Sequence, residues 1–173
     1  MASRSRSHLS NDSLRRSLAL HLAAERGACA ELLADLGEMD VRRLYREDGY
    51  ASMHDFCVGA LGFTSGRAYK RIHVARKARR FPVILDLVAE GKLCLSGAML
   101  LAGHLTEDNA RELFREAAGR TVAQIELMHA RRFPQAYDGI WFENPVLSFQ
   151  WLRSLRREIA CFISTIRSRL KTL

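Results

Sequence analysis

Residues 61–82 read LGFTSGRAYKRIHVARKARRFP and contain seven lysine or arginine residues but no carboxylate. Thr64 or Ser65 can cap a helix that begins here, because a side-chain hydroxyl accepts a hydrogen bond from a free backbone N–H of the first turn. Upstream, Ser52 can cap a helix over MHDFCVGAL, which Gly62 is expected to end. Two helices joined by a short turn that contains glycine form the helix-turn-helix layout. We therefore predict a central helix-turn-helix at about residues 52–80.

The second of these predicted helices has two distinct sides. A period of 3.6 residues places Ala68, Ile72 and Ala75 on one face, which we expect to be buried. Arg76 and Arg79 fall nearer that face, so we expect them to form local ion pairs and to pack their aliphatic stems. The other side offers donors of the kind that guanine edges and phosphates accept. The residues that we predict to contact nucleic acid are Thr64, Ser65, Arg67, Lys70, Arg71, His73 and Lys77.

The positive charge of the chain is concentrated in one window. The 173 residues have a formal net charge of +8, and residues 56–85 hold seven basic and no acidic side chains. Residues 1–55 and 86–134 are each close to neutral, whereas residues 135–173 add six basic and three acidic side chains. A local excess of this kind is typical of proteins that bind a polyanion. We therefore predict double-stranded DNA as the partner.

The amino-terminal part of the chain has the leucine spacing of helices. Residues 10–12 offer cap candidates for a helix over SLRRSLALHLAAER, and Gly27 is expected to end it. A second helix over ACAELLADLGEMDVRRLYRE is expected to stop at Asp48–Gly49. This pattern predicts two packed helices. Their leucine-rich surfaces make a homo-oligomer possible through this part of the chain.

Helical signals continue to about residue 134. Thr106 can cap a helix over EDNARELFREAAG, whose first turn holds carboxylates that favour the helix dipole. Thr121 and Gln124 form the pattern of a capping box for VAQIELMHARRF. No segment alternates with a period of two for long enough to predict a strand, and KLCLS is expected to be a connection. We predict an all-α fold, with one multi-helix domain over residues 1–134.

Several classes of protein do not fit this sequence. No apolar run approaches the roughly 20 residues that a membrane-spanning helix needs, and no secretory signal is present, so we expect a cytoplasmic protein. Phosphate-binding loops, nucleophile elbows and dinucleotide-binding fingerprints are missing, so we predict no cofactor. The cysteines form no C-x-x-C pair, which argues against a zinc ribbon. We expect all four to be small buried apolar residues: Cys29, Cys57, Cys94 and Cys161.

The chain from Asp40 to Pro134 also shows a run of specific motifs. They are GY-S---FC, LG--S--AY-RI--AR-ARRFP, L---G-L-LS, L--HLT--N and ARRFP, of which the second is the longest. In these motifs the chain resembles the helical amino-terminal region of bacterial proteins that end in an HNH endonuclease module. The middle section is also similar, more weakly, to the helix-turn-helix region of ParB-type partition proteins. Both resemblances imply DNA binding.

The resemblance does not extend to catalysis. HNH nucleases use a histidine to polarise water and further His, Asp and Asn residues around one metal ion, in a module that lies beyond the matched region. The six histidines here are scattered. His104, Asp108 and Asn109 lie close in sequence, but Asp108 and Asn109 belong to the first turn of the helix that Thr106 caps. We therefore predict no catalytic residue and no metal site.

The amino-acid composition changes after Pro134, where the resemblance to this family stops. Residues 135–173 contain both tryptophans, Trp141 and Trp151. From about residue 148, apolar residues recur at helical spacing, which predicts an amphipathic helix. We expect a DNA-binding helical module in a truncated or frameshifted copy of the HNH-type protein. The alternatives are a chain that acts with a separate nuclease module, and a helical interaction module whose basic face binds an acidic partner.

Overall fold

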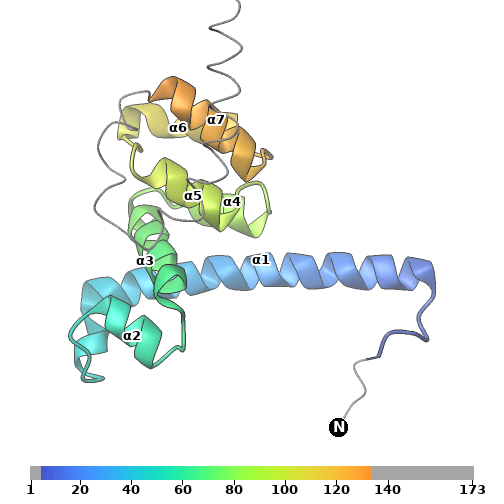
Figure 1. Ribbon diagram of the computed structural model, residues 1–173, viewed down its shortest axis with the longest axis horizontal. Coiled ribbons are helices and arrows are strands. Elements are labelled where there is room, and N and C mark those ends of the chain that lie inside the picture. Colours follow the sequence, from blue (N-terminus) through green and yellow to red (C-terminus); the bar gives the residue numbers. More distant parts are fainter. Residues whose placement is uncertain (1–4, 134–173) are drawn as a thin grey trace, which may run out of the picture. The chain divides into compact units, whose positions relative to one another are not determined.

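The computed structural model describes residues 5–133, and within them it is built of helices without a strand (Figure 1). The predicted all-α fold is therefore confirmed. Of the described residues, those up to His129 belong to one compact unit, and Ala130–Phe133 are assigned to a second unit. The elements are α1 (Asn11–Arg42), the 3-10 helix η1 (Leu44–Arg46), α2 (Met53–Gly59), α3 (Ser65–Arg80), α4 (Val83–Ala89), α5 (Leu95–Ala102), α6 (Glu107–Ala117) and α7 (Val122–Arg132).

The amino-terminal segment is one helix, not two. α1 runs through Gly27 without interruption over 32 residues, so the predicted break is wrong. A glycine inside a helix costs only about 1 kcal/mol relative to alanine, which the apolar contacts of the following turns offset. α1 ends at Arg42, because Arg43 takes the left-handed conformation (φ 57°) and donates its backbone N–H to the carbonyl of Met39. The predicted stop at Asp48–Gly49 is therefore too late for this helix.

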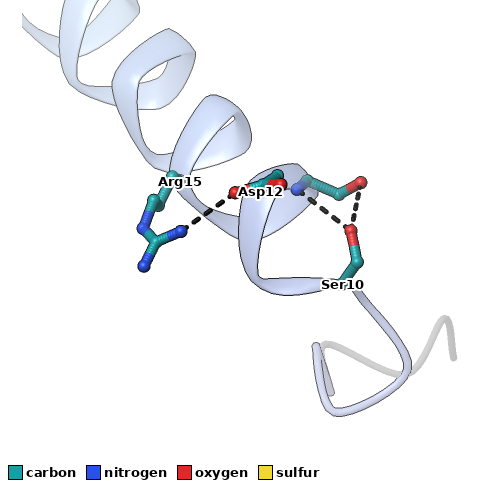
Figure 2. A network of polar contacts seen from close by, with 4 residues as sticks. Ser10, Asp12 and Arg15 are labelled. Carbon is teal, nitrogen blue, oxygen red and sulfur yellow. Dashed lines mark hydrogen bonds and ion pairs between the residues drawn. The ribbon is translucent and has the colours of Figure 1, made fainter.

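The predicted helix caps are confirmed. Figure 2 shows the first of them, in which Ser10 Oγ accepts from the backbone N–H of Ser13 at 3.2 Å and Asp12 pairs with Arg15 at 2.9 Å. A carboxylate in the first turn interacts favourably with the positive end of the helix dipole. The same hydroxyl-to-backbone bond starts four further helices, whose capping residues are Ser52, Thr64, Thr106 and Thr121.

α3 lies at the centre of the packing. It contacts α1, α2, α4 and α5, and Figure 1 shows it crossing α1. Small side chains line this crossing: a Cβ atom added to Gly37 would lie 3.2 Å from the carbonyl oxygen of Ala75. The core around the crossing is apolar, with Leu33 and Leu36 of α1 and Ile84 of α4 at most 2% exposed. Burial of this apolar surface is the main force that holds the helices together.

The first half of α1 lacks such cover. Leu14, Leu18, Leu20 and Leu22 are 44%, 67%, 71% and 41% exposed, whereas Leu33 on the same helix is completely buried. The exposed leucines therefore form an apolar surface on a helix whose second half is part of the core.

Among the described residues, no helix is both long enough and apolar enough to cross a membrane.

The cysteines do not behave alike. Cys57 is completely buried, as predicted, and Cys29 is half-buried. Cys94 is exposed, so the prediction for it is wrong: its Sγ accepts the backbone N–H of Gly97 at 3.4 Å and caps α5. Cys161 and the helix predicted from about residue 148 lie outside the described residues.

Candidate nucleic-acid interface

The connection between α2 and α3 is held by hydrogen bonds at both of its ends. Gly62 has a φ of +64°, a conformation that glycine adopts without steric cost, and Phe63 N–H donates to the carbonyl of Cys57 at 3.0 Å. Thr64 caps α3, and Ser65 Oγ lies 3.1 Å from His54 Nε2 of α2. Thr64 and Ser65, both predicted as contacts, are exposed at this end of α3. The start of α3 is thus held in place by bonds to α2.

The buried side of α3 is wider than the predicted face. Ala68, Ile72 and Ala75 are buried as expected, but Val74 is completely buried too. Because α1, α2 and α5 all pack on α3, more than one side of it is covered. Lys70 and Lys77, expected on the open side, are half-buried, and Arg76 is exposed although it was expected nearer the core.

Three of the seven basic residues are paired with carboxylates. Arg76 donates from Nε to Asp40 Oδ2 at 2.7 Å and from Nη2 to Asp40 Oδ1 at 3.1 Å. The hydrogen bond to Asp40 raises the pKa of Arg76 above its ordinary value. Arg79 Nη2 lies 4.0 Å from Glu38, and Arg80 Nη2 lies 2.8 Å from Glu107. The expected ion pairs of Arg76 and Arg79 are confirmed, and Arg80 adds a third.

The other four basic residues have no carboxylate partner within residues 5–133. They are Arg67, Lys70, Arg71 and Lys77, all of them predicted contacts. At about 100° per residue they fall within an arc of about 120° on one side of α3. Three of the four lie in its first two turns, and no carboxylate stands in the first turn. The amino-terminal half of α3 is therefore the part whose positive charge the fold leaves uncompensated.

Phe63 organises two of these cations. The Arg67 Cζ atom lies 4.5 Å and the Arg71 Cζ atom 5.3 Å from the centroid of the Phe63 ring. Both distances are within the range of cation–π attraction. Burial and the charge of Arg67 lower the pKa of Arg71 below its ordinary value. Phe63 was not among the predicted contacts, because a residue outside the helix has no place in a helical periodicity.

His73 contributes no full positive charge to this surface at neutral pH. Its ring is stacked on that of Tyr69, with centroids 6.1 Å apart and planes 20° apart. Burial, and then the charges of Lys77 and Arg76, lower the pKa of His73 below its ordinary value of 6.5. The ring is therefore mainly neutral at pH 7. Tyr69 is 38% exposed, which makes this pair an aromatic surface on the open side of α3.

The described residues hold no cluster of three or more His, Cys, Asp or Glu side chains that could bind a metal ion. Asn109 has the structural role that its position predicts. Its Oδ1 accepts from the backbone N–H of Thr106 at 2.9 Å, which completes a capping box, and its Nδ2 donates to the carbonyl of His104 at 2.9 Å. Asn109 is therefore used to begin α6.

No family model, curated protein or solved structure matches this chain.

Proposed function

We propose that the chain binds double-stranded DNA through the amino-terminal half of α3. The observation that carries this proposal is the separation of the basic residues into two groups. Arg76, Arg79 and Arg80 are paired with carboxylates. Three residues of the first two turns, Arg67, Lys70 and Arg71, have no such partner among the described residues, and neither does Lys77 further along the helix. Duplex DNA presents one negative charge per about 1.7 Å of its axis, so uncompensated cations gain most from meeting it.

Further support comes from the sequence. Residues 56–85 contain no acidic side chain, so long-range attraction to a polyanion is not cancelled locally. The resemblance to HNH endonuclease-type proteins supports the same role, that of their non-catalytic DNA-binding part. In an alternative form of this proposal, the chain binds DNA in the same way and a separate protein supplies the nuclease. In both forms we expect the chain alone to leave DNA intact with magnesium or manganese, because the catalytic residues of the family have no counterpart in the sequence.

The test is a binding titration against salt concentration. If the four cations each meet a phosphate, log affinity should fall against log salt with a slope of about −3.6, since each contact contributes about −0.9. The triple variant Arg67→Glu, Lys70→Glu, Arg71→Glu should abolish binding while the circular dichroism spectrum stays helical. The matched control is Arg16→Glu, Arg111→Glu, Arg115→Glu, which makes the same charge change at exposed positions of α1 and α6.

The two triple variants distinguish a binding surface from net charge alone. We expect the control to keep most of the affinity, because its arginines are exposed on α1 and α6 and do not belong to α3. Equal weakening in both variants, or unaltered affinity in the α3 variant, would reject the assignment. Tight binding of an acidic peptide in place of DNA would favour the interaction module.

A second proposal is that two copies associate through the first half of α1. Leu14, Leu18 and Leu22 recur every fourth residue and are exposed, on the same side of the helix as Leu33 and Leu36, which are buried. Residues 11–28 hold three arginines and two carboxylates, so repulsion between two copies is small. An antiparallel pair centred on Leu18 would place Leu14 of one copy against Leu22 of the other.

Light scattering during gel filtration tests this second proposal. The variant Leu18→Gln, Leu22→Gln should run as a monomer where the natural chain runs as a dimer. High salt should weaken DNA binding but leave the leucine contact intact, because apolar burial is not screened. A natural chain that is monomeric at every concentration tested would exclude the dimer and leave the DNA proposal unaffected.

A further inference from the structure

We propose that Phe63, Arg67 and Arg71 form a phosphate-binding cluster that grips the DNA backbone, with Phe63 as the positioning residue. This inference rests on the proposed DNA binding for the identity of the molecule that carries the phosphate. It assigns to the two arginines a contact that does not depend on base sequence. It also gives a role to Phe63, which stands just before the cap of α3.

The two guanidinium groups share one aromatic ring. Arg67 and Arg71 are four residues apart on α3, and their Cζ atoms lie 4.5 and 5.3 Å from the same Phe63 centroid. Side chains at this spacing are neighbours on a helix surface, so the two positive charges repel each other. Burial is the main cause of the lowered pKa of Arg71, and the charge of Arg67 lowers it further, as this repulsion predicts. An anion between the two groups would relieve it.

No group within residues 5–133 supplies such an anion. Neither arginine forms an ion pair or a side-chain hydrogen bond to a described residue, and the buried Nε of Arg71 lacks a hydrogen-bond partner. Nε is the only side-chain nitrogen of Arg71 that is buried without a hydrogen-bond partner, so the phosphate contact is assigned to the Nη groups. The cluster is thus held by packing and by the ring of Phe63, not by a carboxylate.

Phosphate is the anion that this arrangement fits. A guanidinium donates two parallel hydrogen bonds to a phosphate, and Arg is favoured wherever such paired recognition is needed. The cluster lies at the start of α3, a 16-residue helix whose first turn has no acidic residue, so the helix dipole adds to the positive potential. Free backbone N–H groups of a first turn also suit phosphate oxygens.

The cluster favours a backbone phosphate over a base edge. Arg71 is half-buried and held against Phe63, so its reach into a groove is restricted. Contacts to phosphates position a protein on DNA without reading its sequence. Because the ring holds both guanidinium groups before the ligand arrives, less conformational freedom is lost on binding.

The experiment compares variants that separate charge from positioning, using several duplexes of unrelated sequence. Arg67→Gln and Arg71→Gln should each weaken binding to all duplexes alike and make the salt slope shallower by about one. Phe63→Leu keeps both charges, so the salt slope should stay the same while affinity falls about two- to fivefold. Arg71→Lys should restore the salt slope but not the full affinity, since lysine cannot donate the paired bonds.

The controls keep this inference separate from the proposed function. A change of sequence preference in the arginine variants would show base contacts and overturn the phosphate assignment, while DNA binding itself stood. Full affinity in Phe63→Leu would remove the positioning role. If the natural chain binds no duplex, the proposed function fails. The phosphate-binding cluster is then tested separately, by NMR of the natural chain. Inorganic pyrophosphate should then shift the Nε–Hε signals of Arg67 and Arg71, and unshifted signals would exclude the cluster.

Discussion

Arg76 of α3 holds Asp40 of α1 through two hydrogen bonds of 2.7 and 3.1 Å, across 36 residues of sequence. The Asp40 side chain is only 15% exposed, whereas that of Arg76 is 61% exposed. A carboxylate that is largely removed from water needs a donor, because its lost hydration is otherwise not replaced. This pair therefore joins α1 to α3 and compensates the positive charge of Arg76 within the fold.

Arg76→Ala should destabilise the fold more than Arg80→Ala. The first substitution leaves the largely buried Asp40 without its donor and should lower the free energy of unfolding by about 1–2 kcal/mol. In the pair of Arg80 and Glu107 both side chains are more than half exposed, so its loss should cost at most about 1 kcal/mol. Urea unfolding followed by circular dichroism measures both. Equal losses of unfolding free energy in the two variants would show that the burial of Asp40 does not make its pair with Arg76 stronger than the exposed pair.

Two glycines of α1 should respond oppositely to alanine. At Gly37 a Cβ atom would lie 3.2 Å from the backbone carbonyl of Ala75 and 3.1 Å from Arg79 Cγ. Because the backbone at the crossing cannot yield easily, Gly37→Ala should lower the free energy of unfolding by about 1–3 kcal/mol. At Gly27 no atom lies within 4 Å of the added Cβ. Gly27→Ala should therefore raise that free energy by about 0.5–1 kcal/mol, through higher helix propensity.

The glycine pair is checked by thermal and urea denaturation of the two variants side by side. Stabilisation by Gly37→Ala would mean that α1 and α3 do not approach closely at Ala75. Destabilisation by Gly27→Ala would mean that the middle of α1 is not a continuous helix.

Asn109→Ala should act on stability and not on metal binding. The substitution removes the capping-box bond to Thr106 and the bond to the carbonyl of His104. The expected loss is about 1–2 kcal/mol of unfolding free energy. Asp108→Ala, at an exposed position in the same turn, should cost only about 0.3–1 kcal/mol through the helix dipole. A melting temperature that falls when a chelator is added would contradict this structural role.

Stability should decrease in mild acid because of buried histidine. His129 is 6% exposed, and burial together with the charge of His104 lowers its pKa below the ordinary 6.5. Burial and the charge of Lys77 lower the pKa of His104 in the same direction. The unfolded chain then binds protons that the folded chain does not, so the free energy of unfolding falls as pH drops below about 6.5. Above that pH both histidines are mainly neutral in the folded and in the unfolded chain, so their burial causes no such loss of stability.

The variant His129→Phe tests the source of this pH dependence. It should reduce the slope of the plot of unfolding free energy against pH between 7.5 and 5.5, a window set by the reference pKa of about 6.5. His104 and His73, whose pKa values are also lowered, keep a part of the slope. His21→Phe, at an exposed position of α1, is the control and should leave the plot unchanged. A natural chain whose stability rises as the pH falls through this window would show that the sign is wrong.

The hydroxyl caps follow from the sequence, because a cap joins residues only three positions apart. Ser52, Thr106 and Thr121 cap the expected helices, and of the two candidates Thr64 and Ser65 it is Thr64 that caps α3. The cap of α5, Cys94, was not predicted. Gly27 was misjudged, since a local propensity of about 1 kcal/mol was outweighed by packing of the later turns of α1.

Tertiary structure decided which cations of α3 are neutralised and which are not. The sequence shows the seven basic residues, and their periodicity predicts ion pairs of Arg76 and Arg79. The partners Asp40 and Glu107, however, lie 36 and 27 residues away from Arg76 and Arg80, which bind them. Only the packing of α1, α2 and α5 on α3 could bury Val74 and half-bury Lys70 and Lys77. Phe63 likewise meets Arg67 and Arg71 because the turn before α3 folds its ring back, a geometry that depends on the carbonyl of Cys57 in α2.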